Sequence, residues 1–380
     1  MSGFPLPPPE PDALAISAAL TARIHTEIAA AGGWIGFERY MQCALYEPGL
    51  GYYSAGSAKL GPAGDFTTAP ELGDALARAL AIELEPALAT LHDPVLLELG
   101  AGSGSLAQQL LAELSRRGAP PVPYRILEPS ADLEQRQREV LAPWGERVSW
   151  LERLPERPFE GLIIANEVLD ALPVACFVKR RERALPLGVA VGEGAFVWAE
   201  GPEDRELGRA VERIETALGF ALPEGYRSEV CLMLPGWLAS LGGALKRGGV
   251  WLVDYGYARR DYYHSQRAGG TLICHYRHRS FDDPFFLPGL VDISAWADFS
   301  AAAEAALAGG LEVTGYTTQA QFLLEALGAG LVNADAGPEA LSALKTLVLP
   351  GEMGERFKLL RLGKGLALSP LPGRDFRGLL

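Results

Sequence analysis

The chain has 380 residues with a net charge of -13 at pH 7, and 48% of its residues are hydrophobic. This composition is ordinary for a globular protein, and the acidic balance argues against a nucleic-acid binder that works by neutralising phosphates. The apolar runs are shorter than the roughly 18 residues that a membrane-spanning helix needs, so we expect no membrane insertion. Four scattered cysteines without CxxC spacing predict reduced thiols in a cytoplasmic protein, and no recognisable ligand spacing predicts a metal site.

The amino-terminal part predicts helices joined by a long loop. The Pro-rich residues 1–12 predict a flexible leader, and residues 13–92 an N-terminal helical and loop region. Within it, apolar residues at steps of about four predict helices over 13–31 and 74–91. Residues 46–73 between them are rich in Gly, Pro and small polar side chains, which predicts a long loop, and its aromatic residues favour an ordered one.

The main domain is expected over residues 93–370, where short apolar strands alternate with helices. Strands are predicted at 95–99, 124–127, 147–151, 161–165 and 248–256, with two more at 310–318 and 356–363. Such alternation is typical of βαβ units, so the fold class is α/β, with a doubly wound, mostly parallel sheet. Insertions are expected near 171–247 and 258–305.

The first of these insertions carries its own predicted elements. Residues 175–200 alternate in polarity and predict an antiparallel hairpin inserted into the sheet order. A helix over 204–218, a strand near 228–234 and a helix to Arg247 are expected after it. The aromatic stretches 261–264 and 282–286 predict either a lid or substrate groove, or plain packing.

A glycine-rich turn follows the first strand in the sequence LLELGAGSGSL (96–106), with glycines at 100, 102 and 104. A P-loop would need a lysine after the turn, and no lysine lies between Lys59 and Lys179. A dinucleotide-binding turn would place its third glycine where Ser105 stands. Simple close packing of a helix on the sheet would also explain the glycines.

The remaining ligand for this turn is S-adenosylmethionine. Gly100, Gly102 and Gly104 let backbone N–H groups approach its carboxylate at a helix N-terminus. Glu98 lies two residues before the turn, where its charge favours the ammonium and sulfonium groups.

Polar residues also follow the other predicted strands. Glu128 ends the second strand, where a carboxylate can bind both ribose hydroxyls of S-adenosylmethionine or of NAD. Asn166, Glu167 and Asp170 follow the fourth strand, on the ligand side of such a sheet. A hydride-transfer enzyme has no evident need for that cluster, whereas a cationic or amine methyl acceptor does.

With these residues assembled, the chain closely resembles the MidA-like family of class I methyltransferases, from about Ile16 to Arg361. The motifs that carry the resemblance are GYY (51–53), GDFTTAPEL (64–72), LLELGAGSGSL (96–106), LEPS (127–130), NEVLDALPV (166–174), VDYGY (253–257), DISAWADFS (292–300) and MGERF (353–357). The sequence departs from its relatives at Ala101 and Ser103, where Pro and Arg are frequent. Both residues are small, so we expect cofactor binding to survive.

The resemblance implies a Rossmann-like sheet of the seven-stranded type and S-adenosyl-L-methionine as the cofactor. The family includes the mitochondrial arginine methyltransferase that assists assembly of respiratory complex I. The resemblance therefore suggests methylation of an arginine on the subunit of the NADH–quinone oxidoreductase that corresponds to the mitochondrial 49-kDa subunit. A small-molecule methyltransferase and a cofactor-binding assembly chaperone remain alternatives.

Carboxylates can orient a guanidinium nitrogen and receive its proton as the methyl group arrives. Glu167 and Asp170 are the first catalytic candidates, on one side of the segment if it is a helical turn, and Glu71 is the third. Asp65 is predicted either to bind the amino end of the cofactor or to cap the helix that begins near Pro70. Asp254, at the end of the fifth strand, is expected to support the site from behind.

Overall fold

The computed structural model describes residues 7–54, 67–332 and 337–380. The chain forms two compact units, and each is built from three separate segments. The central-sheet unit comprises Thr67–Asp170, Leu234–Arg259 and Trp296–Leu380, and the antiparallel unit comprises Met1–Phe66, Ala171–Met233 and Arg260–Ala295. The antiparallel unit thus contains most of the predicted N-terminal region and most of both predicted insertions.

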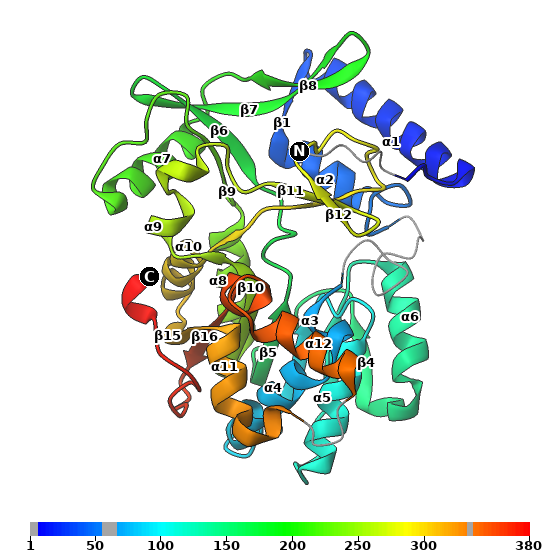
Figure 1. Cartoon of the computed structure of the whole chain (residues 1–380), viewed down its shortest axis with the longest axis vertical. Coiled ribbons are helices and arrows are strands. Elements are labelled where there is room, and N and C mark those ends of the chain that lie inside the picture. Colours follow the sequence, from blue (N-terminus) through cyan, green and yellow to red (C-terminus); the bar gives the residue numbers. More distant parts are fainter. Residues whose placement is uncertain (1–6, 55–66, 333–336) are drawn as a thin grey trace. The chain divides into compact units, whose positions relative to one another are not determined.

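A mixed sheet organises the central-sheet unit (Figure 1). Its strands are β2 (Val95–Leu99), β3 (Tyr124–Leu127), β4 (Val148–Leu151), β5 (Phe159–Asn166), β10 (Leu245–Tyr257), β14 (Ala297–Asp298), β15 (Glu312–Thr318) and β16 (Phe357–Lys364). They are arranged in the order β15-β16-β10-β5-β2-β3-β4, with β14 beside β10. The strands from β10 to β4 are parallel, and β16 is antiparallel to both of its neighbours. The predicted α/β class and the mostly parallel sheet are confirmed.

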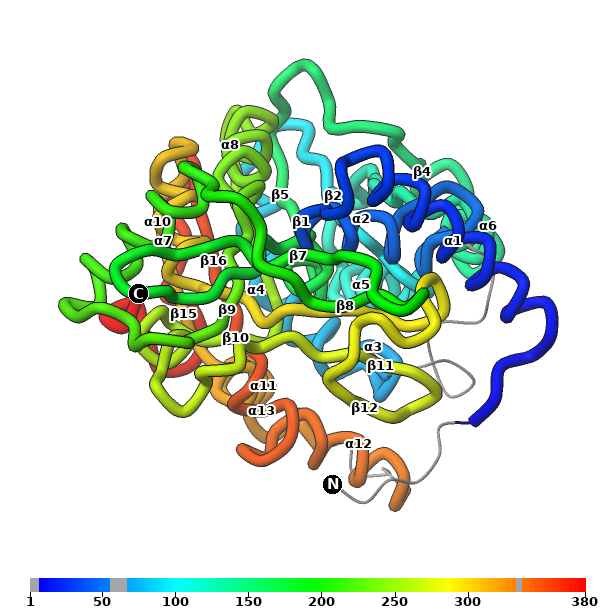
Figure 2. The backbone as a smooth tube through the Cα atoms, turned by 90° about the horizontal axis from the view of Figure 1, so that it is seen from above, coloured from blue at the N-terminus to red at the C-terminus, as the bar shows by residue number. Residues whose placement is uncertain are grey.

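Helices cover this sheet. They are α3 (Ala69–Leu72), α4 (Ala75–Leu88), α5 (Ser105–Arg116), α6 (Ala131–Leu141), α8 (Leu234–Ala244), α10 (Phe299–Ala308), α11 (Gln319–Leu327), α12 (Pro338–Val348) and α13 (Met353–Arg356). Helix α4 packs against α5 and α11, and α8 packs against α10 (Figure 1). The orange helices α11, α12 and α13, which come late in the sequence, pack together (Figure 2).

Alternate residues of the central strands are buried on opposite faces. Leu96 and Leu162 join one hydrophobic cluster with residues of α4, α5 and α11. Their neighbours Leu97 and Ile163 point to the other face and are also buried. Both faces are therefore covered, as in a doubly wound sheet, and the ends of the strands are left for ligands.

The helix predicted to reach Arg247 ends earlier, at Ala244. Leu245 pairs with Phe159 of β5, so residues 245–247 already belong to the parallel sheet. Tertiary pairing overrides the helical pattern here.

The antiparallel unit contains two smaller sheets. One consists of β1 (Trp34–Gly36), β6 (Ala175–Arg180), β7 (Arg183–Gly192), β8 (Ala195–Glu200) and β9 (Arg227–Val230). The other consists of β11 (Ile273–Tyr276), β12 (Arg279–Phe281) and β13 (Asp292–Ser294). Helices α1 (Pro11–Ala30), α2 (Phe37–Tyr46) and α7 (Arg205–Leu218) belong to the same unit, and the short helix α9 (Arg259–Tyr262) lies at its boundary.

The hairpin predicted over 175–200 is present, but its predicted insertion into the central sheet is wrong. Its strands pair with β1 and β9 instead, and Ile35 of β1 lies opposite Val189 of β7. Buried residues of α1, α2 and β7, among them Ile24 and Phe37, form the core under this sheet. Because these partners are far apart in sequence, local patterns gave no sign of the pairing.

None of the helices that the structure describes is both long enough and apolar enough to cross a membrane.

Candidate active site at the carboxyl edge of the central sheet

The carboxyl ends of β3, β2, β5 and β10 lie side by side at one edge of the central sheet. The register places Leu99 of β2 beside Leu127 of β3 and beside Ala165 of β5. Val253 of β10 in turn lies beside Asn166. Residues that follow these strands therefore meet at this edge, where doubly wound folds bind their ligands.

The glycine turn joins β2 to α5. Gly100, Gly102 and Gly104 have φ values of 62°, 56° and 85°, in the left-handed region that side chains disfavour. A Cβ atom at position 100 would lie 3.1 Å from a methyl carbon of Val168. The three glycines thus have a geometric reason, and the turn packs directly against the segment that follows β5.

Glu128 lies just after β3 and is held by two donors. One is the backbone N–H of Ser130, at 3.0 Å, and the other is the side-chain amide of Gln137, at 2.9 Å. The same Gln137 amide nitrogen donates to the carbonyl oxygen of Gly102, at 2.9 Å, and its oxygen accepts from Trp150. Gln137 is fully buried, so one side chain fixes the carboxylate of Glu128 relative to the glycine turn.

Sequence patterns missed Gln137. A glutamine inside an amphipathic helix matches no motif, and its role depends on which elements α6 faces. Its position on the leucine-bearing face of that helix was the only signal in the sequence that could have pointed to it.

Glu71, the third catalytic candidate, lies at the glycine turn. Its carboxylate accepts hydrogen bonds from the hydroxyl groups of Ser103 and of Ser105, the latter at 2.9 Å. Gln109 of α5 also donates to the carbonyl of Pro70, at 2.9 Å. These contacts attach α3 to the beginning of α5.

Glu98 lies inside the sheet and is 2% exposed. Its carboxylate accepts a hydrogen bond from the hydroxyl of Tyr124, at 2.7 Å. Burial raises the pKa of Glu98 to about 7; the Tyr124 hydrogen bond opposes this rise and the charge of Glu128 adds to it. Glu98 therefore lies within β2, beneath the glycine turn, and not on the open edge of the sheet.

This burial predicts a stability that depends on pH. Between its usual pKa of 4.5 and about 7, Glu98 is ionised in the unfolded chain but protonated in the folded one. The free energy of unfolding should therefore fall as the pH rises through this window, by about 3 kcal/mol. Urea unfolding at pH 4 and pH 8 should show this loss in the wild type relative to Glu98→Gln. A difference between the two proteins that does not change with pH would contradict it.

The segment that follows β5 turns sharply at Glu167, which has a φ of 54°. The helical turn on which a shared side for Glu167 and Asp170 depended is therefore absent, because Glu167 is left-handed and its N–H donates to the carbonyl of Val253, at 2.8 Å. The side-chain amide of Asn166 donates to Glu167, at 3.0 Å. The oxygen of that amide is buried and accepts no hydrogen bond among the described residues.

Asp254 lies beneath this segment and is 1% exposed. Burial raises the pKa of Asp254 well above its usual value, and the charges of Asp170 and Glu167 raise it further, against the backbone hydrogen bonds that it accepts. The structure thus brings both predicted catalytic carboxylates close to Asp254. Asp254 accepts hydrogen bonds from backbone amides at 2.8–3.3 Å, which favours the supporting role predicted for it.

Two other predictions concern Asp65 and a metal site. Asp65 lies outside the described residues, and Thr68 is the residue that precedes α3. In the described part of the chain, no group of three or more His, Cys, Asp and Glu side chains could hold a metal ion.

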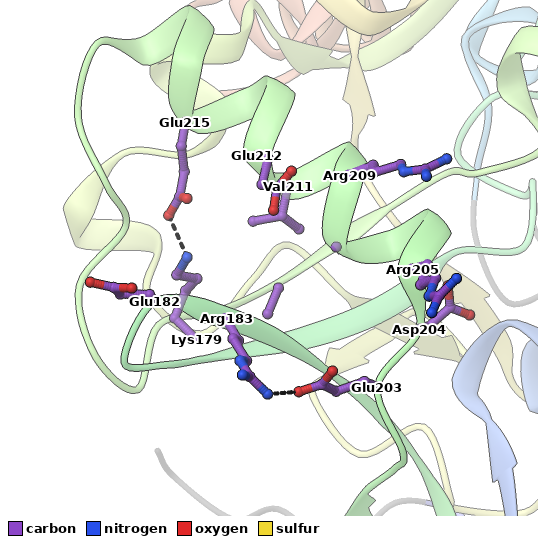
Figure 3. A pocket seen from close by; sticks show the side chains of 12 residues that line it. Lys179, Glu182, Arg183, Glu203, Asp204, Arg205, Arg209, Val211, Glu212 and Glu215 are labelled. Atoms are coloured by element: carbon purple, nitrogen blue, oxygen red, sulfur yellow. Dashed lines mark hydrogen bonds and ion pairs between the residues drawn. The ribbon is translucent and has the colours of Figure 1, made fainter.

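A polar pocket of about 390 Å³ lies in the antiparallel unit, between α7 and the hairpin of β6 and β7 (Figure 3). Within it, the ammonium of Lys179 lies 2.7 Å from Glu215, and Arg183 pairs with Glu203. The predicted site residues are not among those that line it. Because these two pairs join the hairpin to α7 and the residues before it, the pocket is better explained as a junction between helix and sheet than as the active site.

Comparison with known proteins identifies the family and the cofactor. A family model of S-adenosyl-L-methionine-dependent methyltransferases matches residues 75–317. The crystal structure of a Burkholderia thailandensis protein bound to S-adenosyl-homocysteine is similar, with a TM-score of 0.91, 41% sequence identity, and coverage of 99% of this chain and 100% of that chain. A native structure from the same superfamily and organism has a TM-score of 0.89 and 40% identity, with the same coverage. A search of the curated proteins found no match.

The residues at the edge fit such a cofactor. The left-handed glycines leave the backbone open at the beginning of α5, where N–H groups bind carboxylates. Glu128 lies at the end of the neighbouring strand, where a carboxylate can bind a ribose. The chain has a class I methyltransferase-like fold and S-adenosyl-L-methionine as its cofactor. It belongs to the family of S-adenosyl-L-methionine-dependent methyltransferases described by the matching model.

Proposed function

We propose that the protein methylates a guanidinium nitrogen of an arginine side chain in a protein substrate. The observation that carries this acceptor class is the crowding of Glu167, Asp170 and Asp254 at the ends of β5 and β10, where burial raises the pKa of Asp254 and the charges of the other two raise it further. Carboxylates so close to one another repel. A cationic acceptor relieves that repulsion and a neutral one does not.

We place the substrate in the NADH–quinone oxidoreductase, on the subunit that corresponds to the mitochondrial 49-kDa subunit. The resemblance of the NEVLDALPV and GDFTTAPEL motifs to the MidA-like family supports this choice. Methylation of that subunit would then support assembly of the complex in the cytoplasm.

The cofactor would lie along the glycine turn. Gly100, Gly102 and Gly104 would receive its methionine carboxylate, and Glu128 would bind its ribose hydroxyls. Glu98 would act on this site from below, through the charge that it carries once the pH exceeds its raised pKa of about 7. Asn166, whose amide oxygen is buried without a described donor, would complete the binding site at the end of β5.

Two further carboxylates belong to this proposal. Glu71 is bonded to Ser103 and Ser105 in the turn, which favours a place beside the ammonium of the cofactor over direct contact with the acceptor. Asp65 keeps both of its predicted roles, at the amino end of the cofactor or as the cap of the helix that begins near Pro70.

The bridge formed by Gln137 makes a prediction about cofactor affinity. Gln137→Ala should weaken S-adenosyl-homocysteine binding by about tenfold, because Glu128 and the Gly102 carbonyl both lose the same donor. Isothermal titration calorimetry would measure the change. Gln135→Ala, an exposed position on the same helix, is the matched control and should bind normally. Equal affinities for the two variants would argue against the bridge.

At the acceptor side, the cofactor when bound supplies an electrophilic methyl group. Glu167 and Asp170 would accept hydrogen bonds from the acceptor guanidinium and so orient one nitrogen in line with that group. A protonated guanidinium is a poor nucleophile, with a pKa above 12. One of these carboxylates must therefore receive the proton that the nitrogen loses.

Mass spectrometry of the candidate oxidoreductase subunit tests the proposed substrate. An arginine of this subunit should carry methyl groups in cells that have the gene and lack them in cells without it. The purified enzyme with labelled cofactor should restore the modification on subunit from the deleted strain. Unmodified subunit in both strains would reject this substrate.

The same materials separate the other functions. Label from the cofactor that appears in metabolites of a cell extract, and not in protein, would indicate a small-molecule methyltransferase. Restoration of complex I assembly by an inactive Glu167→Ala protein would indicate a chaperone that binds the cofactor without catalysis.

A further inference from the structure

Three consecutive backbone amides after β5 converge on one carboxylate oxygen. The N–H groups of Val168, Leu169 and Asp170 lie 3.1, 2.8 and 3.3 Å from Oδ2 of Asp254. Successive amides that point into one concavity form a nest for an anion. In this protein the anion is a side chain of the neighbouring strand.

A second contact fixes the start of the same segment. The N–H of Glu167 donates to the carbonyl of Val253, the residue before Asp254, at 2.8 Å. Glu167 itself is left-handed, a conformation that costs a residue with a side chain about 1–2 kcal/mol. Without an external constraint, the segment would relax out of this turn. Two successive residues of β10 supply that constraint.

The other oxygen of Asp254 is also occupied. Its Oδ1 atom accepts from the N–H of Tyr255, at 2.9 Å. Both oxygens therefore face donors, and a side-chain amide cannot replace them, because its NH2 group would point at another N–H. The position requires a carboxylate on chemical grounds and not only a side chain of this size.

The nest also gives the three carboxylates different surroundings. Asp254 is buried, and both of its carboxyl oxygens accept hydrogen bonds from backbone N–H groups. Glu167 is half-buried and belongs to the segment that the nest shapes. This difference suits Asp254 to holding the backbone of the segment, and the carboxylates of the segment to binding the acceptor.

From this geometry we infer that Asp254 is a positioning residue for methyl transfer, which holds Glu167 and Asp170 in the arrangement that binds the acceptor. The inference rests on the proposed function for the identity of the acceptor. It goes further by naming the group that sets the acceptor geometry without touching cofactor or acceptor. It also connects the two halves of the site, since Val168 packs against Gly100 of the glycine turn.

The test compares Asp254→Asn with the wild type in two independent ways. Hydrogen exchange of the peptide that covers residues 167–171 should be at least about tenfold faster in the variant, because three amides lose their carboxyl acceptor. The kcat/KM for methyl transfer should fall by about 10²-fold, as expected when reacting groups shift by about an ångström. The affinity for S-adenosyl-homocysteine should change by less than about threefold, because the glycine turn keeps its own contacts.

Asp204→Asn is the matched control. Asp204 also accepts from two backbone amides, at 2.7 and 3.0 Å, but at the start of α7 in the antiparallel unit. This variant should accelerate exchange only near residues 205–208 and leave kcat/KM unchanged. A loss of activity equal to that of Asp254→Asn would show that any lost cap has this effect, and would overturn the inference.

A second variant guards against simple misfolding. Asp254→Glu keeps the carboxylate but displaces it by one methylene, so it should restore part of the amide protection while kcat/KM stays low. Unchanged exchange and unchanged kcat/KM in Asp254→Asn would overturn the inference. Faster exchange together with a wild type that does not methylate the oxidoreductase subunit would reject the proposed substrate and still support the positioning role.

Discussion

Replacing Glu167 by Gln should lower kcat for methyl transfer by about 10²- to 10³-fold, while the affinity for S-adenosyl-homocysteine stays within about threefold of the wild type. An amide of the same shape can still accept one hydrogen bond from the acceptor. It cannot receive a proton, and its NH2 group faces a donor instead of attracting it. Single-turnover kinetics with saturating cofactor, alongside calorimetry for binding, would measure the two quantities separately.

Glu160→Gln is the control for this substitution. Glu160 belongs to the same strand, β5, but lies at its opposite end, where it pairs with Lys246 at 3.1 Å. Both variants replace a glutamate by glutamine, but Glu160 lies a full strand length away from the carboxyl edge. The kcat of Glu160→Gln should therefore be unchanged. Loss of cofactor affinity in Glu167→Gln would instead assign Glu167 to the cofactor, and an unchanged kcat would transfer the proton-accepting role to Asp170.

The central sheet could be predicted from the sequence because each strand carries its own signal. Strands buried on both faces are short apolar runs, and the helices between them have amphipathic spacing, so β2 to β5 were located to within a few residues. The antiparallel unit lacks such local information. Strand β1 has three residues and pairs with β7 from a distant segment, and no periodicity in either strand indicates that partner.

The same distinction applies to the site. Because ligands bind at the carboxyl ends of parallel strands, it could be predicted that Glu128, Asn166 and Glu167 lie at one edge of the sheet. The contacts that shape the edge were not predictable, because they depend on backbone conformation. The left-handed φ of Glu167 and the amide nest around Asp254 exist only once β5 and β10 are adjacent.

Gly102→Val should abolish measurable cofactor binding, with a loss of at least about 10²-fold in affinity. Gly102 has a φ of 56°, where a β-branched residue is a strong outlier. The backbone would have to rotate, and with it the carbonyl that accepts from Gln137. Because Gln137 also donates to Glu128, the distortion reaches the carboxylate that we propose binds the ribose, as well as the turn. Calorimetric titration with S-adenosyl-homocysteine would measure the loss.

Strain alone is not the reason for this expectation, and Gly118→Val shows the difference. Gly118 follows α5 with a φ of 76°, and the space that a Cβ atom would occupy there is open, so valine costs a similar 1–2 kcal/mol of stability. It lies at the far end of the helix from the glycine turn, and its variant should bind the cofactor normally. If both variants lost affinity equally, general destabilisation would explain the effect and the turn would lose its assignment. Affinity lost only at Gly102 would tie cofactor binding to the backbone geometry of the turn itself.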